Sequence, residues 1–136
     1  MLAPVQYCGP PPYSCNRTLQ TLCNSYTPMA KIVNWASINN DENEIASTLI
    51  DKGPLSVLLD ASTLSFYHKG IYNPTICNDE ELNHAVLLVG FGEENGIQYW
   101  SVKNSWGKQW GEDGYFRIVR GVNKCGIASD VTTSIM

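Results

Sequence analysis

The sequence predicts an α+β fold, in which an antiparallel sheet of barrel type is accompanied by one short helix. Two observations support this prediction: several strand-like apolar runs follow one another, and only one stretch combines helical spacing with end-capping residues. The 136 residues suffice for one domain with a substantial core, but not for two large domains. We therefore expect one β-rich domain.

The helical stretch spans residues 41–52. Asp41 can accept hydrogen bonds at its start, and Glu44, three residues on, completes the pattern of a capping box. The pair Gly53-Pro54 ends the helix in the expected way. The apolar stripe that should face the core consists of Ile45, Leu49 and Ile50.

Strand-like runs surround this helix. Residues 30–38 have strand character, and residues 55–61 (LSVLLDA) are typical of a buried strand. A turn over residues 65–71 should be held by nearby aromatic anchors, namely Phe66, Tyr67 and Tyr72. Another strand is expected over residues 115–120, and a last extended segment over residues 125–136.

The most informative stretch lies between Leu82 and Phe116, LNHAVLLVGFGEENGIQYWSVKNSWGKQWGEDGYF. His84 opens an apolar run to Phe91, a turn follows at residues 92–96, and a second run covers residues 99–103. Polar and aromatic residues come directly after it, Asn104, Ser105 and Trp106. The pattern predicts a hairpin with polar groups at strand ends, where a site can be held rigidly.

The composition excludes several classes of function. Hydrophobic residues make up 43% and charged residues 16%, which is typical of a globular rather than a disordered chain. The net charge of -4 argues against nucleic acid as a partner. No apolar run is long enough to cross a membrane, and the N-terminus lacks the basic and apolar regions of a signal peptide.

Five cysteines, at positions 8, 15, 23, 77 and 125, indicate an oxidising compartment. Because their number is odd, at least one lacks a partner within this sequence. Residues 1–28 are rich in proline and small polar residues, which predicts irregular structure held by disulfides. The sequon Asn16-Arg17-Thr18 agrees with secretion. We therefore expect an N-terminal part to lie outside this sequence.

Taken singly, the residues of the hairpin have simple structural explanations. His84 could be a core histidine, Asn104 a turn residue, and Trp106 and Trp110 core aromatics. Their combination is far more specific. The pattern NHAV…GFG…YW…KNSWG..WGE.GY resembles the papain-like cysteine proteases of the cathepsin group, densely from His84 onward and more weakly back to about Pro4.

The resemblance implies a role for each residue of the pattern. His84 would be the acid/base partner of a cysteine nucleophile, Asn104 would orient its ring, and Trp106 would shield their hydrogen bond. A thiol with a pKa near 8.5 needs a neighbouring imidazolium to exist as thiolate at neutral pH. The same imidazole then protonates the leaving amine. A neutral amide fixes the ring without adding a full charge.

The nucleophile itself is expected outside this chain. In the family, a Gln followed by Cys-Gly-Ser-Cys-Trp lies about 130–150 residues before the histidine, whereas only 83 residues precede His84. The segment from Gln6 to Cys15 looks similar, but three prolines interrupt it and no Trp follows Cys15. The catalytic cysteine and the oxyanion-hole glutamine would both be absent, so the chain alone should be inactive.

The resemblance also divides the chain. Residues 1–36 would be a remnant of a helical domain with the crossing between domains, and residues 37–136 the β-rich C-terminal domain. Cys77 and Cys125 would form a disulfide in this second domain. Cys8 resembles a half-cystine with an upstream partner, while Cys15 and Cys23 form either a local pair or bonds to the missing half.

By the same resemblance, the main specificity pocket has Leu58, Leu82 and Ala85 as walls and Asp130 as its floor. An acid at the bottom of an apolar slot is poorly solvated unless a cation reaches it. We therefore expect a complete enzyme to accept Arg there as well as Leu or Phe. In the alternative, the Asp130 side chain turns to solvent.

Two functions follow. The first is the C-terminal half of a lysosomal or secreted papain-like cysteine endopeptidase, which acts on peptides or proteins and needs the helical domain as its partner. The second is a non-catalytic peptide-binding or regulatory half-domain that pairs with another chain. The intact His84, Asn104 and Trp106 favour the first, because a binder does not need them. No cofactor or metal is predicted, since His68 and His84 lack ligand spacing with free cysteines.

Overall fold

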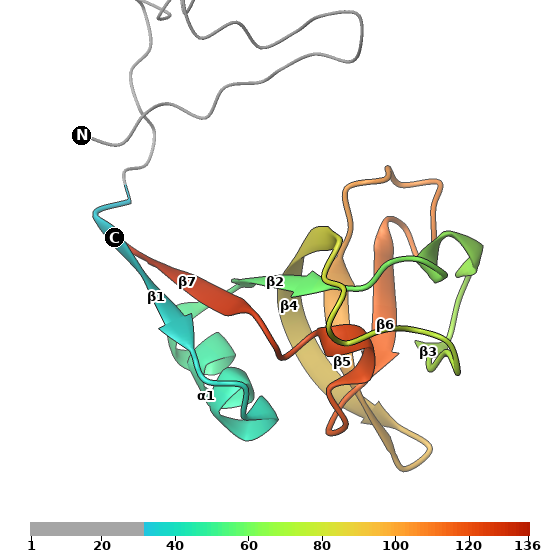
Figure 1. The fold of residues 1–136 in the computed structure, drawn as a ribbon, viewed down its shortest axis with the longest axis horizontal. Coiled ribbons are helices and arrows are strands. Elements are labelled where there is room, and N and C mark those ends of the chain that lie inside the picture. The colour runs from blue at the N-terminus through green and yellow to red at the C-terminus, as the bar shows by residue number, and fades with distance from the viewer. Residues whose placement is uncertain (1–31) are drawn as a thin grey trace, which may run out of the picture. The chain divides into compact units, whose positions relative to one another are not determined.

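Seven strands and one α-helix build the part of the chain that the computed structural model describes, residues 32–136 (Figure 1). The helix α1 spans Glu42–Lys52, and two short 3-10 helices are η2 (Leu64–Phe66) and η3 (Lys124–Gly126). The predicted disulfide-rich stretch, with Cys8, Cys15 and Cys23, lies outside the described residues. The strands are β1 (Asn34–Ile38), β2 (Leu55–Leu59), β3 (Ile71–Tyr72), β4 (His84–Glu94), β5 (Ile97–Lys103), β6 (Tyr115–Val119) and β7 (Val131–Ile135).

All strands belong to one mixed sheet with the order β1-β7-β2-β4-β5-β6-β3. Neighbouring strands are antiparallel, except that β3 runs parallel to β6. The expected strand and helix content is present, but the predicted barrel is not confirmed, because the edge strands β1 and β3 do not pair. The edge strand β3 has only two residues, so the ladder ends there instead of returning to β1. Near the opposite edge, the end of β7 lies beside the start of β1 (Figure 1).

The start of α1 is encoded locally, as predicted. The Asp41 carboxylate accepts hydrogen bonds from the backbone N–H groups of Asn43 at 2.8 Å and Glu44 at 3.4 Å. The Glu44 side chain is bonded to the side-chain amide of Asn39, at 2.9 and 3.1 Å, in place of the reciprocal capping-box bond to residue 41. None of the helices in the described part is long and apolar enough to span a membrane.

The buried face of α1 differs from the predicted stripe. Ile45, Ala46 and Leu49 are buried, whereas Ile50 is 75% exposed. Each helical residue advances by about 100°, so Ile50 lies about 140° around the helix from Ile45 and outside the buried face. The small side chain of Ala46 takes its place.

The first turn of α1 is tied to the sheet by Glu42. Its carboxylate accepts hydrogen bonds from the Trp100 indole at 2.7 Å and from the backbone N–H groups of Gly121 and Asn123 at 2.7 and 2.6 Å. Trp100 is itself 1% exposed, on β5. Glu42 therefore joins three segments that are far apart in the sequence.

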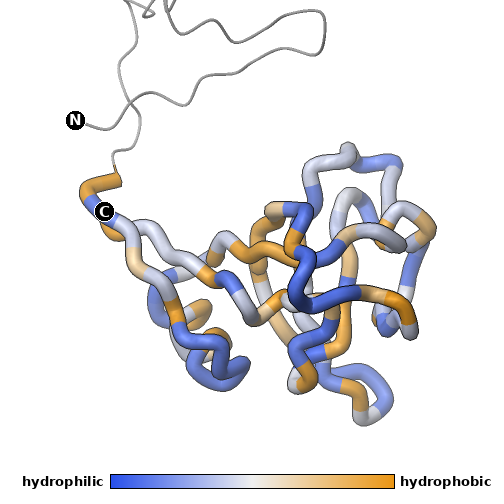
Figure 2. Tube along the Cα trace, viewed as in Figure 1, coloured by the Kyte–Doolittle hydropathy of each residue, from blue (hydrophilic) through white to orange (hydrophobic). Residues whose placement is uncertain are grey.

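The core lies along the central strands, whose apolar stretches alternate with polar ones (Figure 2). Alternation along β2 buries Leu55, Val57 and Leu59. In the predicted aromatic turn, Tyr67 is buried but Phe66 is 80% exposed, so Phe66 is no anchor. Residues three apart share a face of a 3-10 turn, so Leu64 and Tyr67 point inward together and Phe66 does not.

The hairpin turn between β4 and β5 is shorter than predicted. Only Asn95 and Gly96 form it, with φ angles of 53° and 77°, and the pair Glu94 and Ile97 closes the ladder. Two left-handed residues are typical of a tight type I′ turn, for which Asn-Gly is the preferred sequence. The predicted turn over residues 92–96 therefore belongs mostly to β4.

Candidate active site

The hairpin brings the two polar candidates together. His84 is the first residue of β4, and Asn104 follows the last residue of β5. Because β4 and β5 are antiparallel, the start of β4 and the end of β5 lie at the same end of the hairpin. The backbone N–H of Asn104 donates to the carbonyl of Gly114 at 2.9 Å, which holds this strand end in place.

The side chains of His84 and Asn104 are hydrogen bonded, with 2.9 Å between His84 Nε2 and Asn104 Oδ1. The same oxygen accepts the backbone N–H of Ser105 at 2.8 Å. A backbone N–H can only donate, so the Asn104 atom that faces both groups is the oxygen. Nε2 of His84 must therefore carry the proton, and Nδ1 is left as the nitrogen that can take up or release one.

The indole of Trp106 covers this pair. Its ring stacks on the His84 ring, with 4.9 Å between centroids and 29° between planes. Trp110 packs edge-on against Trp106 at 5.0 Å and also contacts Tyr67 and Phe116 in the core. Trp106 is 41% exposed, so one side of the indole faces solvent while the other covers the imidazole.

Glu112 holds the loop that carries both tryptophans. Its carboxylate accepts two hydrogen bonds from the Arg117 guanidinium, each at 2.9 Å, and one from the backbone N–H of Gly70 at 2.8 Å. Hydrogen bonding from Arg117 lowers the pKa of Glu112, although partial burial opposes this. The loop after β5 is thus anchored to β6 and to the turn before β3.

The residues expected to form the specificity pocket are distributed over neighbouring segments. Leu58 pairs with Ala85 across β2 and β4, and its N–H donates to the carbonyl of Asp130 at 3.1 Å. The Leu82 side chain lies against Gly126. Asp130 and Ala85 are exposed, while Leu58 and Leu82 are half-buried. Within residues 32–136, the Asp130 carboxylate is therefore not enclosed by an apolar slot.

A depression of about 420 Å³ lies next to the His84–Asn104 pair. It includes Ala85 and Asn104, but not the other three pocket candidates. Besides Asn104, three polar residues line it, Ser56, Lys103 and Ser105, and the sequence pattern assigned a role to none of them. Its lining residues are Ser56, Ala85, Val86, Leu87, Lys103, Asn104 and Ser105.

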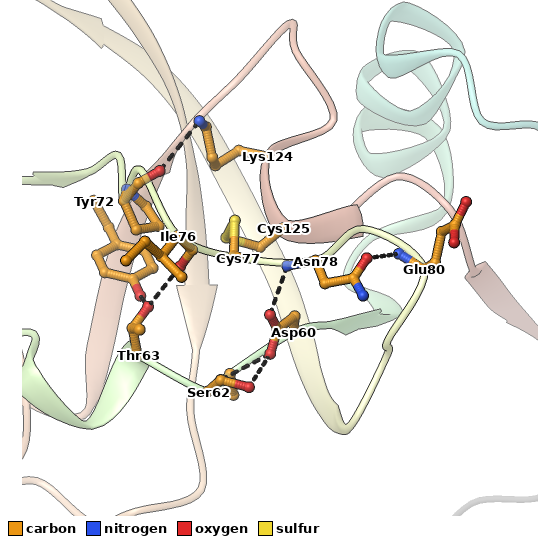
Figure 3. The surroundings of a disulfide bond; sticks show 12 residues. Asp60, Ser62, Thr63, Tyr72, Ile76, Cys77, Asn78, Glu80, Lys124 and Cys125 are labelled. Carbon is orange, nitrogen blue, oxygen red and sulfur yellow. Dashed lines mark hydrogen bonds between the residues drawn. A yellow bond between two sulfur atoms is a disulfide. The ribbon is translucent and has the colours of Figure 1, made fainter.

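A disulfide joins Cys77 to Cys125, with 5.2 Å between their Cα atoms (Figure 3). It ties the loop before His84 to η3. Because both cysteines of the described part are oxidised, residues 32–136 offer no thiol to His84. The same part contains no group of three or more side chains that could hold a metal ion.

Sequence reasoning gave no role to Asp60, which is 3% exposed and bonded to the residue before His84. The sequence did contain a signal for Asp60, namely an acidic residue at the end of an apolar strand. Such a residue must find hydrogen-bond donors when it is buried. Those donors come from Ser62, Asn78 and Asn83 and could not be identified from the sequence pattern alone.

The family model for the papain family of cysteine proteases matches residues 5–135, almost the whole chain. This chain belongs to the papain family of cysteine proteases. The resemblance to papain-like cysteine proteases, noted from the His84 and Asn104 motifs, is thereby confirmed.

Papain-family relatives and structures support the assignment. A viral cathepsin of Adoxophyes honmai nucleopolyhedrovirus is 50% identical over 95 residues, which cover 70% of this chain and 27% of the viral protein. Cathepsin F of Mus musculus is 40% identical over 118 residues, which cover 84% of this chain and 26% of the mouse protein. A digestive procathepsin L2 proteinase from the larval midgut of Tenebrio molitor has a TM-score of 0.77 at 41% identity, over 79% of this chain and 35% of that one.

This papain-family chain spans only part of its relatives. Among eight curated relatives that it matches, it covers from 25% to 38% of their length. The match therefore concerns one region of a papain-family protease, the region with the His84–Asn104 pair.

Proposed function

We propose that this chain supplies the histidine and asparagine of a papain-like cysteine endopeptidase that hydrolyses peptide bonds in peptides or proteins. One observation carries the proposal. Asn104 Oδ1 lies 2.9 Å from His84 Nε2 and accepts its N–H. This leaves Nδ1 for proton exchange with a thiol. The stacked Trp106 adds cover from water on one side of the ring.

The proposed reaction uses His84 twice. A cysteine thiolate attacks the scissile carbonyl carbon, and the His84 imidazolium donates its Nδ1 proton to the departing amine. The neutral imidazole then takes a proton from the water that attacks the thioester, and the carboxylic acid leaves as the thiolate is restored. Throughout, Asn104 Oδ1 accepts the Nε2–H, so the ring keeps its orientation while Nδ1 changes its protonation state.

We propose that the nucleophile comes from a helical domain outside this chain. The two cysteines of the described part form a disulfide, and the segment around Cys8 and Cys15 lacks the motif of a nucleophilic cysteine. The chain alone is then inactive, because His84 has no thiol to activate. The cysteine-rich composition supports a lysosomal or secreted location.

The test is a chimera in which this chain replaces the matching C-terminal region of mouse cathepsin F. We expect the chimera to hydrolyse peptide substrates and to react with a thiol-directed peptide epoxide. His84→Ala in the chimera should lower kcat by more than about a thousandfold, and Asn104→Ala should have a smaller effect because it only frees the ring. A folded chimera that binds substrate peptide without cleaving it would instead favour the peptide-binding half-domain.

The chain alone provides the matching control. We expect no hydrolysis and no reaction with the epoxide under non-reducing conditions. Labelling of Cys8, Cys15 or Cys23, lost in the His84→Ala variant, would place the nucleophile within this sequence and overturn that part of the proposal.

For specificity, we propose that Leu58, Leu82 and Ala85 form the walls of the main pocket and that Asp130 selects Arg. The Asp130 carboxylate is exposed and is free to meet a guanidinium, with which it can form two hydrogen bonds. In the chimera, Asp130→Ala should lower kcat/KM for Arg peptides about tenfold and leave Phe peptides nearly unchanged. An equal effect on both would contradict this role.

A further inference from the structure

The carboxylate of Asp60 is buried one residue beyond β2 and is fully occupied by hydrogen-bond donors. Oδ1 accepts the backbone N–H of Ser62 at 2.9 Å, the Ser62 hydroxyl, and the side-chain amide of Asn83 at 3.0 Å. Oδ2 accepts the backbone N–H of Asn78 at 2.7 Å (Figure 3). Burial alone would raise the pKa of Asp60, but these hydrogen bonds lower it to about 2.

Asn83 links this carboxylate to the active site. Its side-chain oxygen accepts the backbone N–H of Ala61 at 2.9 Å, so its nitrogen is the atom that faces Asp60. The backbone N–H of Asn83 also donates to the carbonyl of Leu59 at 3.2 Å. Both side-chain ends and the main chain of Asn83 are thus held, and the next residue is His84.

A second arm of the same network reaches the disulfide. Asn78, which donates to Asp60 Oδ2, directly follows Cys77, and the backbone N–H of Asp60 donates to the carbonyl of Cys125 at 2.9 Å. The loop over residues 77–83 is therefore bonded to Asp60 near both of its ends, by Asn78 (Figure 3) and by Asn83. This loop leads directly into His84, whose backbone pairs with Leu59, the neighbour of Asp60.

We propose that Asp60 is a positioning residue for His84, acting through Asn83 and the loop over residues 77–83. As a carboxylate it offers only acceptors, which matches the donors around it. Its catalytic importance rests on the function proposed above, but the positioning itself is a property of this chain. A ring displaced by about 1 Å would lose the alignment of Nε2–H with Asn104 Oδ1 and weaken the stacking on Trp106.

The experiment is proton NMR of the 136-residue chain, which contains two histidines. In the wild type, the His84 Nε2–H should exchange slowly with water, and ring protons of His84 should be shifted upfield by the stacked Trp106. His68 is exposed and serves as the internal reference. In Asp60→Asn, an amide NH2 group replaces one carboxylate oxygen and faces N–H donors. We therefore expect loss of the slowly exchanging proton and of most of the upfield shift, with His68 unchanged.

The reciprocal exchange makes the test independent of mere loss of stability. Asn83→Asp places two carboxylates against each other and should disturb His84 as Asp60→Asn does. The double variant Asp60→Asn/Asn83→Asp restores the donor–acceptor pair between these two side chains, while the backbone N–H of Ser62 loses its Oδ1 acceptor. The His84 signals should therefore return part of the way toward those of the wild type. Ile45→Ala, a core variant in α1, is the control for destabilisation and should leave the His84 signals in place.

Wild-type His84 signals in both single variants would overturn the proposal, as would equal losses in Ile45→Ala. A double variant no better than the worse single variant would also contradict it, because the amide–carboxylate pairing would then not be the cause. None of these measurements requires peptidase activity, so failure of the proposed function would leave them interpretable.

Discussion

The two ends of β4 are held in different ways. At its far end, Asn95 and Gly96 form a two-residue turn, and the pairing of β4 with β5 continues up to this turn. At its start, His84 depends on Asp60, Asn78 and a disulfide whose two cysteines are 48 residues apart in the sequence. Local backbone preference forms the first end, and packing of distant segments forms the second.

The two ends of β4 contribute differently to the geometry of the site. A tight turn fixes the register of a hairpin, so it determines that His84 and Asn104 can meet. It does not fix the direction of the His84 ring. That direction depends on Asn104 and Trp106 on one side and on the Asp60 network behind His84.

The largest expected effect is at the His84 end, on removal of the disulfide. In the double variant Cys77→Ser/Cys125→Ser, the unfolded chain regains the freedom that a link across 48 residues removes. The free energy of unfolding should fall by about 4 kcal/mol. Urea denaturation without reductant measures it. A fall below about 1 kcal/mol would show that the Asp60 hydrogen bonds hold the loop without the disulfide.

Gly126→Ala should have the next largest effect. Gly126 has a φ of +75°, and an added Cβ would lie 2.5 Å from Leu82 Cδ2 and 2.8 Å from the carbonyl oxygen of Asp79. Both neighbours belong to the loop before His84. We expect a loss of about 3 kcal/mol in the free energy of unfolding, from backbone strain together with the clash. Thermal unfolding and the His84 ring shifts would report it.

The pH dependence of stability should reveal Asp60. Its pKa falls from 3.8 to about 2 on folding, so the stabilisation is fully present above the unfolded-state value. It is lost as the pH falls through the folded-state pKa. The wild type should lose up to about 2 kcal/mol of stability between pH 5 and pH 2, less any solvent screening. Asp60→Asn should lack this component, so parallel acid profiles of the two proteins would contradict the assignment.

The smallest effect should be at the hairpin end. Gly96 has a φ of +77°, close to that of Gly126, but nothing lies within 4 Å of an added Cβ. Gly96→Ala should therefore cost only the left-handed backbone penalty, about 1 kcal/mol. Because Gly96 and Gly126 have nearly equal φ angles, the difference between their alanine variants measures chiefly the tertiary contact. Equal losses in thermal unfolding would mean that the contact with Leu82 and Asp79 is easily relieved.

Much of the secondary structure was predictable. The predictions came within a few residues for helix α1, its Asp41 cap and the strands β2, β4, β5 and β6. Caps and apolar periodicity act over short distances, so they can be recognised in the sequence. The exposed positions of Ile50 and Phe66 were not predicted, since an apolar side chain does not reveal which face of a helix or turn will be covered. The open ladder was also missed, because sheet closure depends on both edge strands together.

From the sequence alone one could identify the hairpin, with its turn expected over residues 92–96, and the candidates His84 and Asn104, because these signals lie in one short stretch. Tertiary packing, in contrast, places the Asn104 oxygen against Nε2 of His84 and the buried Asp60 carboxylate against the loop that precedes His84. Such contacts join residues 18 to 23 positions apart, and their geometry is set by how separate strands and loops pack against each other.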